Sequence, residues 1–148
     1  MKTLKKQLLG TLLTVAPLSA FGAETFSTIM VYKSPTCGCC SEWVKHLQES
    51  GFKVMSHNVQ DVGKYKEKAN LPYGMGSCHT AFVDGYAIEG HVPASDIRRM
   101  LTEKTDIRGI AVPGMPIGSP GMEYGDRKDA YQTISYTKGG HKSVFASH

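Results

Sequence analysis

The sequence predicts a single α/β domain with the element order β-α-β-α-β-β-α, followed by a Pro/Gly-rich loop and a C-terminal extension. In the first half, segments rich in β-branched and aromatic residues alternate with segments of helical periodicity. An Asp-Gly pair then separates two further strand-like segments. The chain has 148 residues, of which 41% are hydrophobic and 20% charged, so it can bury a core and is not a disordered segment.

The first four elements form a β-α-β-α series. Residues 25–33 (TFSTIMVYK) are predicted to form a strand, which the following Ser-Pro-Thr sequence ends. Residues 41–50 are predicted to form a helix because their apolar side chains have helical spacing and Gly51 follows. Apolar and polar residues alternate along 52–59, which predicts a second strand. Residues 62–69 are predicted to form a short helix.

A hairpin and a third helix complete the series. The Asp-Gly pair at 84–85 lies between strand-like residues 79–83 and 86–89, which predicts a tight hairpin. Residues 94–104 have the apolar spacing of a helix. A parallel β-α-β unit that is followed by a hairpin and a helix is the thioredoxin-like order.

The remaining residues differ in composition. Residues 112–126 contain three prolines, four glycines and two methionines, which exclude a helix or a central strand. A long loop of this kind in a small domain is usually functional or disordered. Residues 131–136 and 143–146 are predicted to form a C-terminal hairpin.

Residues 1–23 have the layout of a secretory signal peptide. Three lysines lie among the first six residues, an uncharged apolar stretch follows at 8–18, and small residues lie near Ala23. Cleavage after Ala20, Gly22 or Ala23 is compatible with this pattern. An amphipathic helix is the alternative, but the apolar stretch has no polar face beyond two threonines. The prediction is therefore a mature domain of residues 24–148 in the bacterial periplasm.

Charge and hydropathy exclude two classes of function. The formal net charge is +4, but the signal peptide contains three of the 17 basic residues and no acidic residue. The mature chain keeps 14 basic residues against 13 acidic ones, and no basic helix or stacking platform favours nucleic-acid binding. No apolar run reaches the roughly 18 residues of a membrane span.

The four cysteines are the most informative residues. An even number of cysteines in an oxidising compartment usually indicates structural disulfides. Here Cys37, Cys39 and Cys40 are crowded into one turn, and Cys78 is the one remote partner, which favours chemistry over crosslinking. Cys37 and Cys40 have redox-pair spacing just before a helix, where the helix dipole and free N–H groups favour thiolates.

Cys39 is an additional thiol, and a metal site accounts for it as one more ligand. Sulfur ligands select soft metals, namely Cu(I), zinc or iron–sulfur clusters. Structural zinc usually takes two separated cysteine pairs, which this sequence lacks. The adjacent thiolates Cys39 and Cys40 point in different directions and suit bridging between several ions. This favours a small copper–thiolate cluster.

Other candidate ligands lie further along the chain. If the hairpin is aligned with that of thioredoxin-like proteins, Cys78 faces Cys37 and Cys40; the alternative is a buried packing residue. Met115 and Met122 offer soft thioether ligands in the Pro/Gly-rich loop, or they anchor the loop to the core. Met75, His79 and His91 are further candidates whose ordinary role would be structural.

Three sequence runs together resemble the CopG-type periplasmic copper-resistance proteins. They are SPTCGCCSEWVKHLQESGFKV, SCHTAFVDGYAIEGHVPASDIRRML and GIAVPGMPIGSPGMEYG, and the resemblance extends over residues 27–136. It implies a thioredoxin-like fold, copper at the cysteine cluster and a role in copper or silver tolerance. It also implies several copper ions at bridging thiolates, with redox change, in some members. Cys37, Cys39, Cys40, Cys78, Met115 and Met122 match the family's motifs.

The sequence is compatible with more than one function. The first is copper binding, with or without Cu(I)/Cu(II) interconversion, together with other periplasmic copper-handling proteins. The second is thiol–disulfide exchange, with Cys37 as the nucleophile and Cys40 as the resolving thiol. A passive zinc or disulfide module is disfavoured by the crowding of three cysteines.

Overall fold

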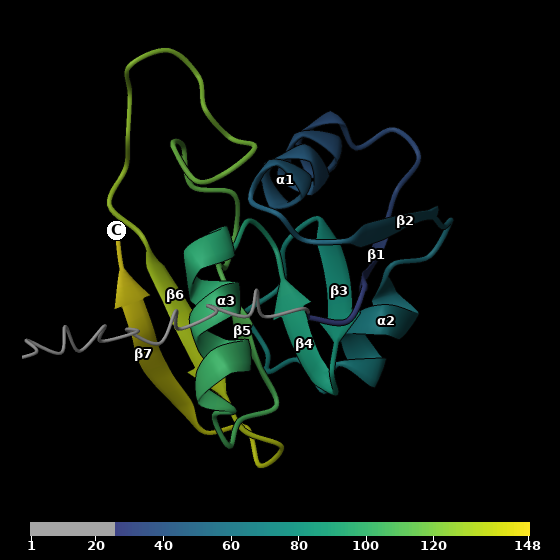
Figure 1. Ribbon diagram of the computed structural model, residues 1–148, viewed down its shortest axis with the longest axis vertical. Helices are drawn as coiled ribbons and strands as arrows, with labels where there is room; N and C mark the ends of the chain where they lie inside the picture. The colour runs from purple at the N-terminus through teal and green to yellow at the C-terminus, as the bar shows by residue number, and fades with distance from the viewer. Residues whose placement is uncertain (1–25) are drawn as a thin grey trace, which may run out of the picture.

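The computed structural model describes residues 26–148, so the predicted signal peptide lies outside the described residues. The fold is mixed α/β and is built on one seven-stranded sheet of order β2-β1-β3-β4-β5-β6-β7 (Figure 1). The elements are β1 (Ile29–Lys33), α1 (Gly38–Glu49), β2 (Val54–Asn58), α2 (Gly63–Lys68), β3 (His79–Val83), β4 (Tyr86–Glu89), α3 (Ala94–Glu103), β5 (Gly109–Ala111), β6 (Gln132–Tyr136) and β7 (Lys142–Ser147).

The predicted order β-α-β-α-β-β-α is confirmed from β1 to α3. The predicted start of the first helix is wrong by three residues, because α1 begins at Gly38 and not at Ser41. Cys37 has an extended backbone (φ −80°, ψ 95°) and is the N-cap residue of this helix. Cys39 and Cys40 therefore lie within the first helical turn. The first strand begins at Ile29, later than predicted.

Strand β5 is absent from the sequence prediction, and three residues are too few to show a periodicity. It pairs in parallel with β4 and antiparallel with β6. At Gly109 a Cβ atom would lie 2.2 Å from the carbonyl oxygen of Ala87, so only glycine allows this approach. The predicted C-terminal hairpin is confirmed as β6 and β7, which extends the sheet.

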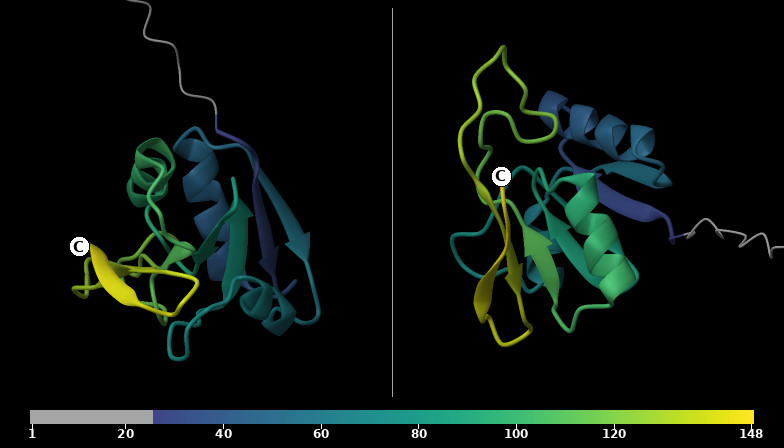
Figure 2. Two further views of the ribbon diagram at one scale, coloured as in Figure 1. Left: turned by 90° about the horizontal axis from the view of Figure 1, so that it is seen from below. Right: turned by 60° about the vertical axis from the view of Figure 1, so that its left-hand side comes forward.

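Alternation along the central strands creates two separate apolar clusters. Ile88 and Ile110 belong to the larger cluster, which receives Trp43 and Leu47 from α1 and Ile97 and other residues from α3. The intervening strand residues contribute to a second cluster, whose buried members are Ala69, Met75, Ala87, Ala111 and Tyr136. Helices α1 and α3 thus cover one face of the sheet (Figure 2).

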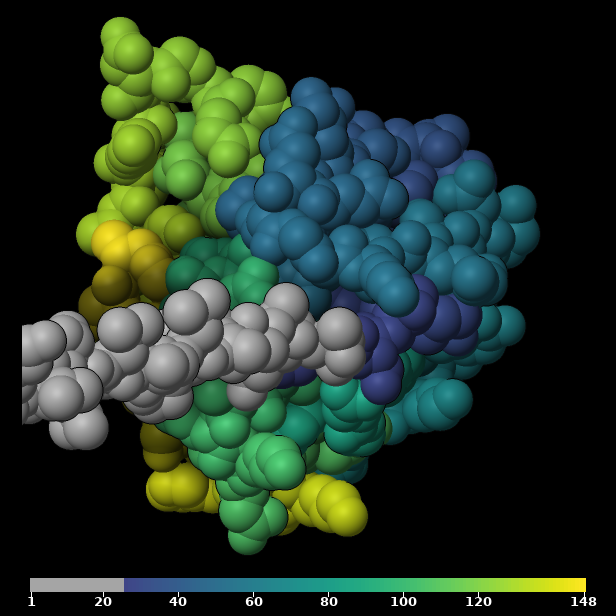
Figure 3. Space-filling model, in the orientation of Figure 1, coloured from purple at the N-terminus to yellow at the C-terminus, as the bar shows by residue number. Residues whose placement is uncertain are grey.

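The loop between β5 and β6 lies against α1 (Figure 3). Gly121, in this loop, has φ +84°, and a Cβ atom there would lie 2.7 Å from both the carbonyl oxygen of Cys39 and the backbone nitrogen of Trp43. Glycine therefore allows the loop to touch the backbone of the first helical turn. None of the helices within residues 26–148 has both the length and the apolar composition of a membrane span.

Candidate metal centre

The sheet register explains why the four cysteines meet. Strands β1 and β3 are antiparallel neighbours, and Lys33 pairs with His79. The residues that follow Lys33 and the residue that precedes His79 therefore lie at the same end of the sheet. Cys37 follows β1 and begins α1, whereas Cys78 immediately precedes β3.

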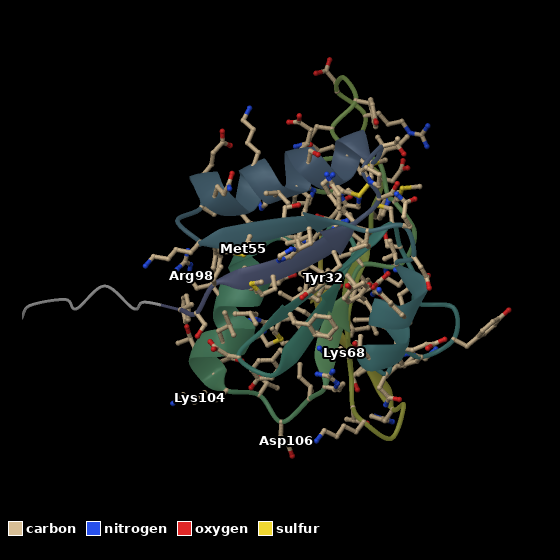
Figure 4. The ribbon with its side chains drawn as sticks, turned by 90° about the vertical axis from the view of Figure 1, so that its right-hand side faces the viewer. Tyr32, Met55, Lys68, Arg98, Lys104 and Asp106 are labelled. Atoms are coloured by element: carbon tan, nitrogen blue, oxygen red, sulfur yellow. A yellow bond between two sulfur atoms is a disulfide. The ribbon has the colours of Figure 1, made fainter. Side chains whose placement is uncertain are left out.

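The four cysteine sulfur atoms form one cluster, in which all Sγ atoms lie within 4.8 Å of one another. Cys37 and Cys40 form a disulfide, and Cys39 and Cys78 are free thiols. The Sγ atom of Cys39 lies 3.6 Å from that of Cys37 and 3.9 Å from that of Cys78. Figure 4 shows sulfur atoms gathered at one end of α1. The four sulfur atoms thus converge at one place, as the sequence predicts.

His91 is held with one ring nitrogen directed at this cluster. Its side chain is fully buried, and Nε2 lies 3.2 Å from the Sγ atom of Cys78. Its Nδ1 lies 2.8 Å from the carbonyl oxygen of Pro120, which can only accept a hydrogen bond, so Nδ1 carries the proton. Burial lowers the pKa of His91, against the opposing effect of this hydrogen bond. Neutral His91 therefore presents the Nε2 lone pair to Cys78.

His79 is a second buried imidazole at the same place. Its Nδ1 lies 3.7 Å from the Sγ atom of Cys78, and its ring packs against Trp43. Burial, and then the neighbouring His91 and Lys66, lower the pKa of His79 well below its ordinary value. Its Nε2 is buried without a hydrogen-bond partner among residues 26–148. Cys78, His79 and His91 form a second, mixed sulfur–nitrogen group of possible metal ligands.

The thiol of Cys78 holds its proton tightly in the metal-free protein. Burial, and then the charge of Cys39, raise the pKa of Cys78 to about 11. A bound cation reverses both effects because it stabilises the thiolate and screens the repulsion between the two sulfurs. A metal ion that bound here would therefore displace protons.

The methionines of the Pro/Gly-rich loop have different exposures. Met122 is 8% exposed and follows Gly121, which touches the first turn of α1. Met115 is 50% exposed and follows Gly114, whose carbonyl oxygen accepts a hydrogen bond from Ser77. Met75 is buried within the smaller apolar cluster, which accounts for it as a packing residue.

Three contributions to the site have no marker in the sequence. They are the carbonyl oxygen of Pro120 on His91, the close approach of Gly121 to α1, and the buried carboxylate of Glu89, which accepts a hydrogen bond from the backbone of Ser77. The clustering of Gly and Pro was a signal that the loop mattered, but each of these contacts depends on tertiary packing.

The fold and the site define a mixed α/β protein with a cysteine- and histidine-rich cluster that can hold metal ions. A solved structure titled "Copper resistance protein copG- Form 2" is 51% identical, with a TM-score of 0.80, over 84% of this chain and 99% of that chain. A second, titled "Copper resistance protein copG- Form 1", is also 51% identical, with a TM-score of 0.78, over 83% of this chain and 98% of that chain. This chain belongs to the CopG copper resistance protein family.

A protein-family model described as "Protein of unknown function, DUF411" matches residues 75–122. The matched segment includes Cys78, both buried histidines and the two loop methionines, but not Cys37, Cys39 and Cys40. The search of curated protein sequences returned no match.

Proposed function

We propose that this chain is a periplasmic protein for resistance to copper, and to silver as a chemically similar soft ion, that binds copper at Cys37, Cys39, Cys40 and Cys78. The observation that carries the proposal is the approach of all four Sγ atoms to within 4.8 Å of one another. Thiolates are the ligands that Cu(I) prefers. The resemblance to two solved copper resistance proteins supports copper over zinc.

The proposed site holds more than one copper ion. Cys39 and Cys40 are adjacent on the first turn of α1, so their side chains leave the helix in different directions. Such thiolates bridge neighbouring ions more readily than they chelate one ion. His91 and His79 add nitrogen ligands on the side of Cys78. Met115 and Met122 add thioethers from the loop.

The disulfide gives the site a redox function. Disulfide sulfurs lack the thiolate charge that binds metal, so a site with four thiolates requires Cys37 and Cys40 to be reduced. Conversely, the two thiols can reduce two Cu(II) ions to Cu(I), with formation of the disulfide and release of two protons. The electrons come from the sulfur atoms, which links Cu(I)/Cu(II) interconversion to the state of this pair.

The proposed fold family is thioredoxin-like. The sheet order β2-β1-β3-β4, the parallel β1–β2 pair and a helix that begins at a C-x-x-C sequence support this proposal. We also propose that residues 1–23 are the signal peptide, that residues 24–148 form the one metal-binding domain, and that its partners are copper ions and other periplasmic copper-handling proteins.

The test is an anaerobic Cu(I) titration of the fully reduced protein, followed by metal analysis and X-ray absorption. We expect more than one copper per chain, copper–sulfur ligation and a short copper–copper distance. Cys39→Ser should lower the stoichiometry, whereas Ser41→Ala, a change one residue beyond Cys40 in the same helix, should not. Full copper occupancy in the Cys39→Ser variant would refute the proposal.

A second candidate function, thiol–disulfide oxidoreductase, is favoured by the Cys37–Cys40 disulfide itself. Cys37 is half-exposed at the N-terminus of α1, as a nucleophile requires, and Cys40 is buried behind it, as a resolving thiol is. Reduction of insulin by the metal-free protein tests this function. Turnover that requires Cys37 and Cys40 but tolerates Cys39→Ser would favour it over copper binding.

A further inference from the structure

Two free thiols lie next to the disulfide. Cys39 is 3.6 Å from Cys37, which is bonded to Cys40, and Cys39 is also 3.9 Å from Cys78. The four sulfurs therefore form a continuous series in the order 40, 37, 39, 78. Sulfur atoms at these separations are close to contact, and thiol–disulfide exchange starts from such proximity.

We propose that the disulfide migrates within the protein, from Cys37–Cys40 to Cys39–Cys78. The reaction is an isomerisation: one disulfide and two thiols are present before and after it, so no external oxidant or reductant takes part. It requires no metal and is a different activity from the copper binding proposed above. It converts the C-x-x-C pair into two free thiols in a protein that remains oxidised overall.

The first step forms a bond between Cys39 and Cys37. The thiolate of Cys39 attacks the Sγ atom of Cys37, the Cys37–Cys40 bond breaks, and Cys40 leaves as a thiolate. Cys40 lies in the first turn of α1, where the free backbone N–H groups and the helix dipole stabilise the departing charge.

The second step forms the bond between Cys78 and Cys39. Cys78 attacks the Sγ atom of Cys39, the Cys37–Cys39 bond breaks, and Cys37 leaves as a thiolate. The proton that Cys78 gives up is taken by the departing sulfur, and the imidazole of His91 packs 3.2 Å from Cys78 on one side.

The attacking cysteine of the second step is held in place from the other side. The preceding residue, Ser77, donates its backbone N–H to the buried carboxylate of Glu89 and its hydroxyl to the carbonyl oxygen of Gly114. The strand β3 begins directly after Cys78. Cys78 is therefore fixed between a strand and a clamped residue, and the movement that closes the Cys39–Cys78 bond falls to the first turn of α1.

A peptide map of the metal-free full chain tests the proposal. Trypsin places Cys37, Cys39 and Cys40 in one peptide, residues 34–45, and Cys78 in another, residues 69–98. The Cys37–Cys40 disulfide is internal to the first peptide, whereas the migrated disulfide joins the two. Protein with one disulfide per chain is incubated at neutral pH, its free thiols are alkylated, and it is digested and mapped by mass spectrometry.

We expect the joined peptides in about a tenth or more of the monomeric chains, with Cys37 and Cys40 alkylated. Cys39→Ser should abolish the joined species and leave the Cys37–Cys40 disulfide intact. Ser41→Ala should change neither the rate at which the joined species appears nor its yield. Size exclusion before digestion removes disulfides formed between chains.

Two results would overturn the proposal. One is a wild-type map that contains only the internal disulfide at every time point, which needs no variant to interpret. The other is a joined species that forms equally well in Cys39→Ser, since Cys78 would then have attacked the C-x-x-C pair directly. Neither result bears on the copper titration, so the two proposals fail separately.

Discussion

The backbone N–H of Ser77 donates a hydrogen bond of 2.6 Å to Oε1 of Glu89, whose side chain is fully buried. The hydroxyl of Thr80 donates to the other carboxylate oxygen over 2.7 Å, and the ammonium group of Lys66 also donates to this carboxylate. Three donors, two of them three residues apart, thus satisfy one buried charge. Since Cys78 follows Ser77, this carboxylate fixes the backbone that presents one of the candidate ligands.

Removal of this carboxylate should destabilise the fold strongly. Glu89→Ala leaves the ammonium of Lys66, which is largely buried, and the N–H of Ser77 without their acceptor. The loss of one partner from a buried ion pair typically costs about 3–5 kcal/mol. Urea unfolding of the metal-free protein measures the change. Glu89→Gln, which keeps an acceptor oxygen, should cost less.

An exposed ion pair provides the control for that experiment. Lys45 and Glu49 face each other one turn apart on α1, with side chains 64% and 68% exposed. Lys45→Met should change the free energy of unfolding by less than about 1 kcal/mol. Equal effects of Lys45→Met and Glu89→Ala would show that the carboxylate of Glu89 does not have the structural importance we assign to it.

Gly121→Ala should displace the loop from α1. The new Cβ would lie 2.7 Å from two backbone atoms of the helix, which cannot move as a flexible side chain can. Gly125→Ala is the matched control, because Gly125 also has a positive φ (+60°) but no atom within 4 Å of the new Cβ. Both variants incur the cost of a left-handed alanine, about 1–2 kcal/mol.

Only Gly121→Ala should lose a further amount, about 1–3 kcal/mol from overpacking. The comparison is made by urea unfolding, with the copper stoichiometry as a second readout. A lower stoichiometry in Gly121→Ala alone is expected if contact of the loop with α1 contributes to the site. Indistinguishable unfolding curves for the two variants would contradict the close packing.

The stability of the metal-free protein should fall as the pH drops below 6.5. Burial lowers the pKa of His79 well below the ordinary histidine value of about 6.5, and the pKa values of His46 and His91 are also lowered. Between the folded and unfolded pKa values the unfolded chain binds protons that the native chain does not, so the free energy of unfolding rises with pH in this window. Above the unfolded pKa this contribution is constant.

His79→Phe separates the contribution of His79 from those of the other histidines. It should flatten the pH dependence by up to about 1.4 kcal/mol per pH unit, whatever its effect on stability at neutral pH. His141→Gln, a change at an exposed side chain near the β6–β7 turn, is the control. An unchanged slope in His79→Phe, measured by urea unfolding at several pH values, would show that His79 is protonated in the native state.

The two loop methionines should differ in their effect on stability. Met122 is 8% exposed, so Met122→Ala should cost about 2–5 kcal/mol as a core truncation does. Met115 is 50% exposed, and Met115→Ala should cost less than about 0.5 kcal/mol. Thermal unfolding of the metal-free proteins measures both. Copper affinity is then compared only in the variant that keeps its stability.

Much of the framework follows from local patterns. The Asp-Gly turn and its two flanking strands lie where the pattern predicted them, because so short a turn brings the two adjacent segments into antiparallel pairing. The start of α1 was misplaced, since Cys37 is an N-cap residue whose side chain makes no capping hydrogen bond and so leaves no sequence marker. Strand β5 was missed because its partners are distant in sequence.

The sequence by itself determined which chemistry is available: three thiols in one turn and a fourth thiol just before a predicted strand. The tertiary structure decided how these groups are used. Antiparallel pairing of β1 with β3 brings the remote thiol to the others, Pro120 selects the ring nitrogen of His91 that faces it, and Glu89 fixes its backbone. Residue type sets the affinity for a soft metal, whereas distances between groups far apart in sequence depend on the packing of the whole sheet.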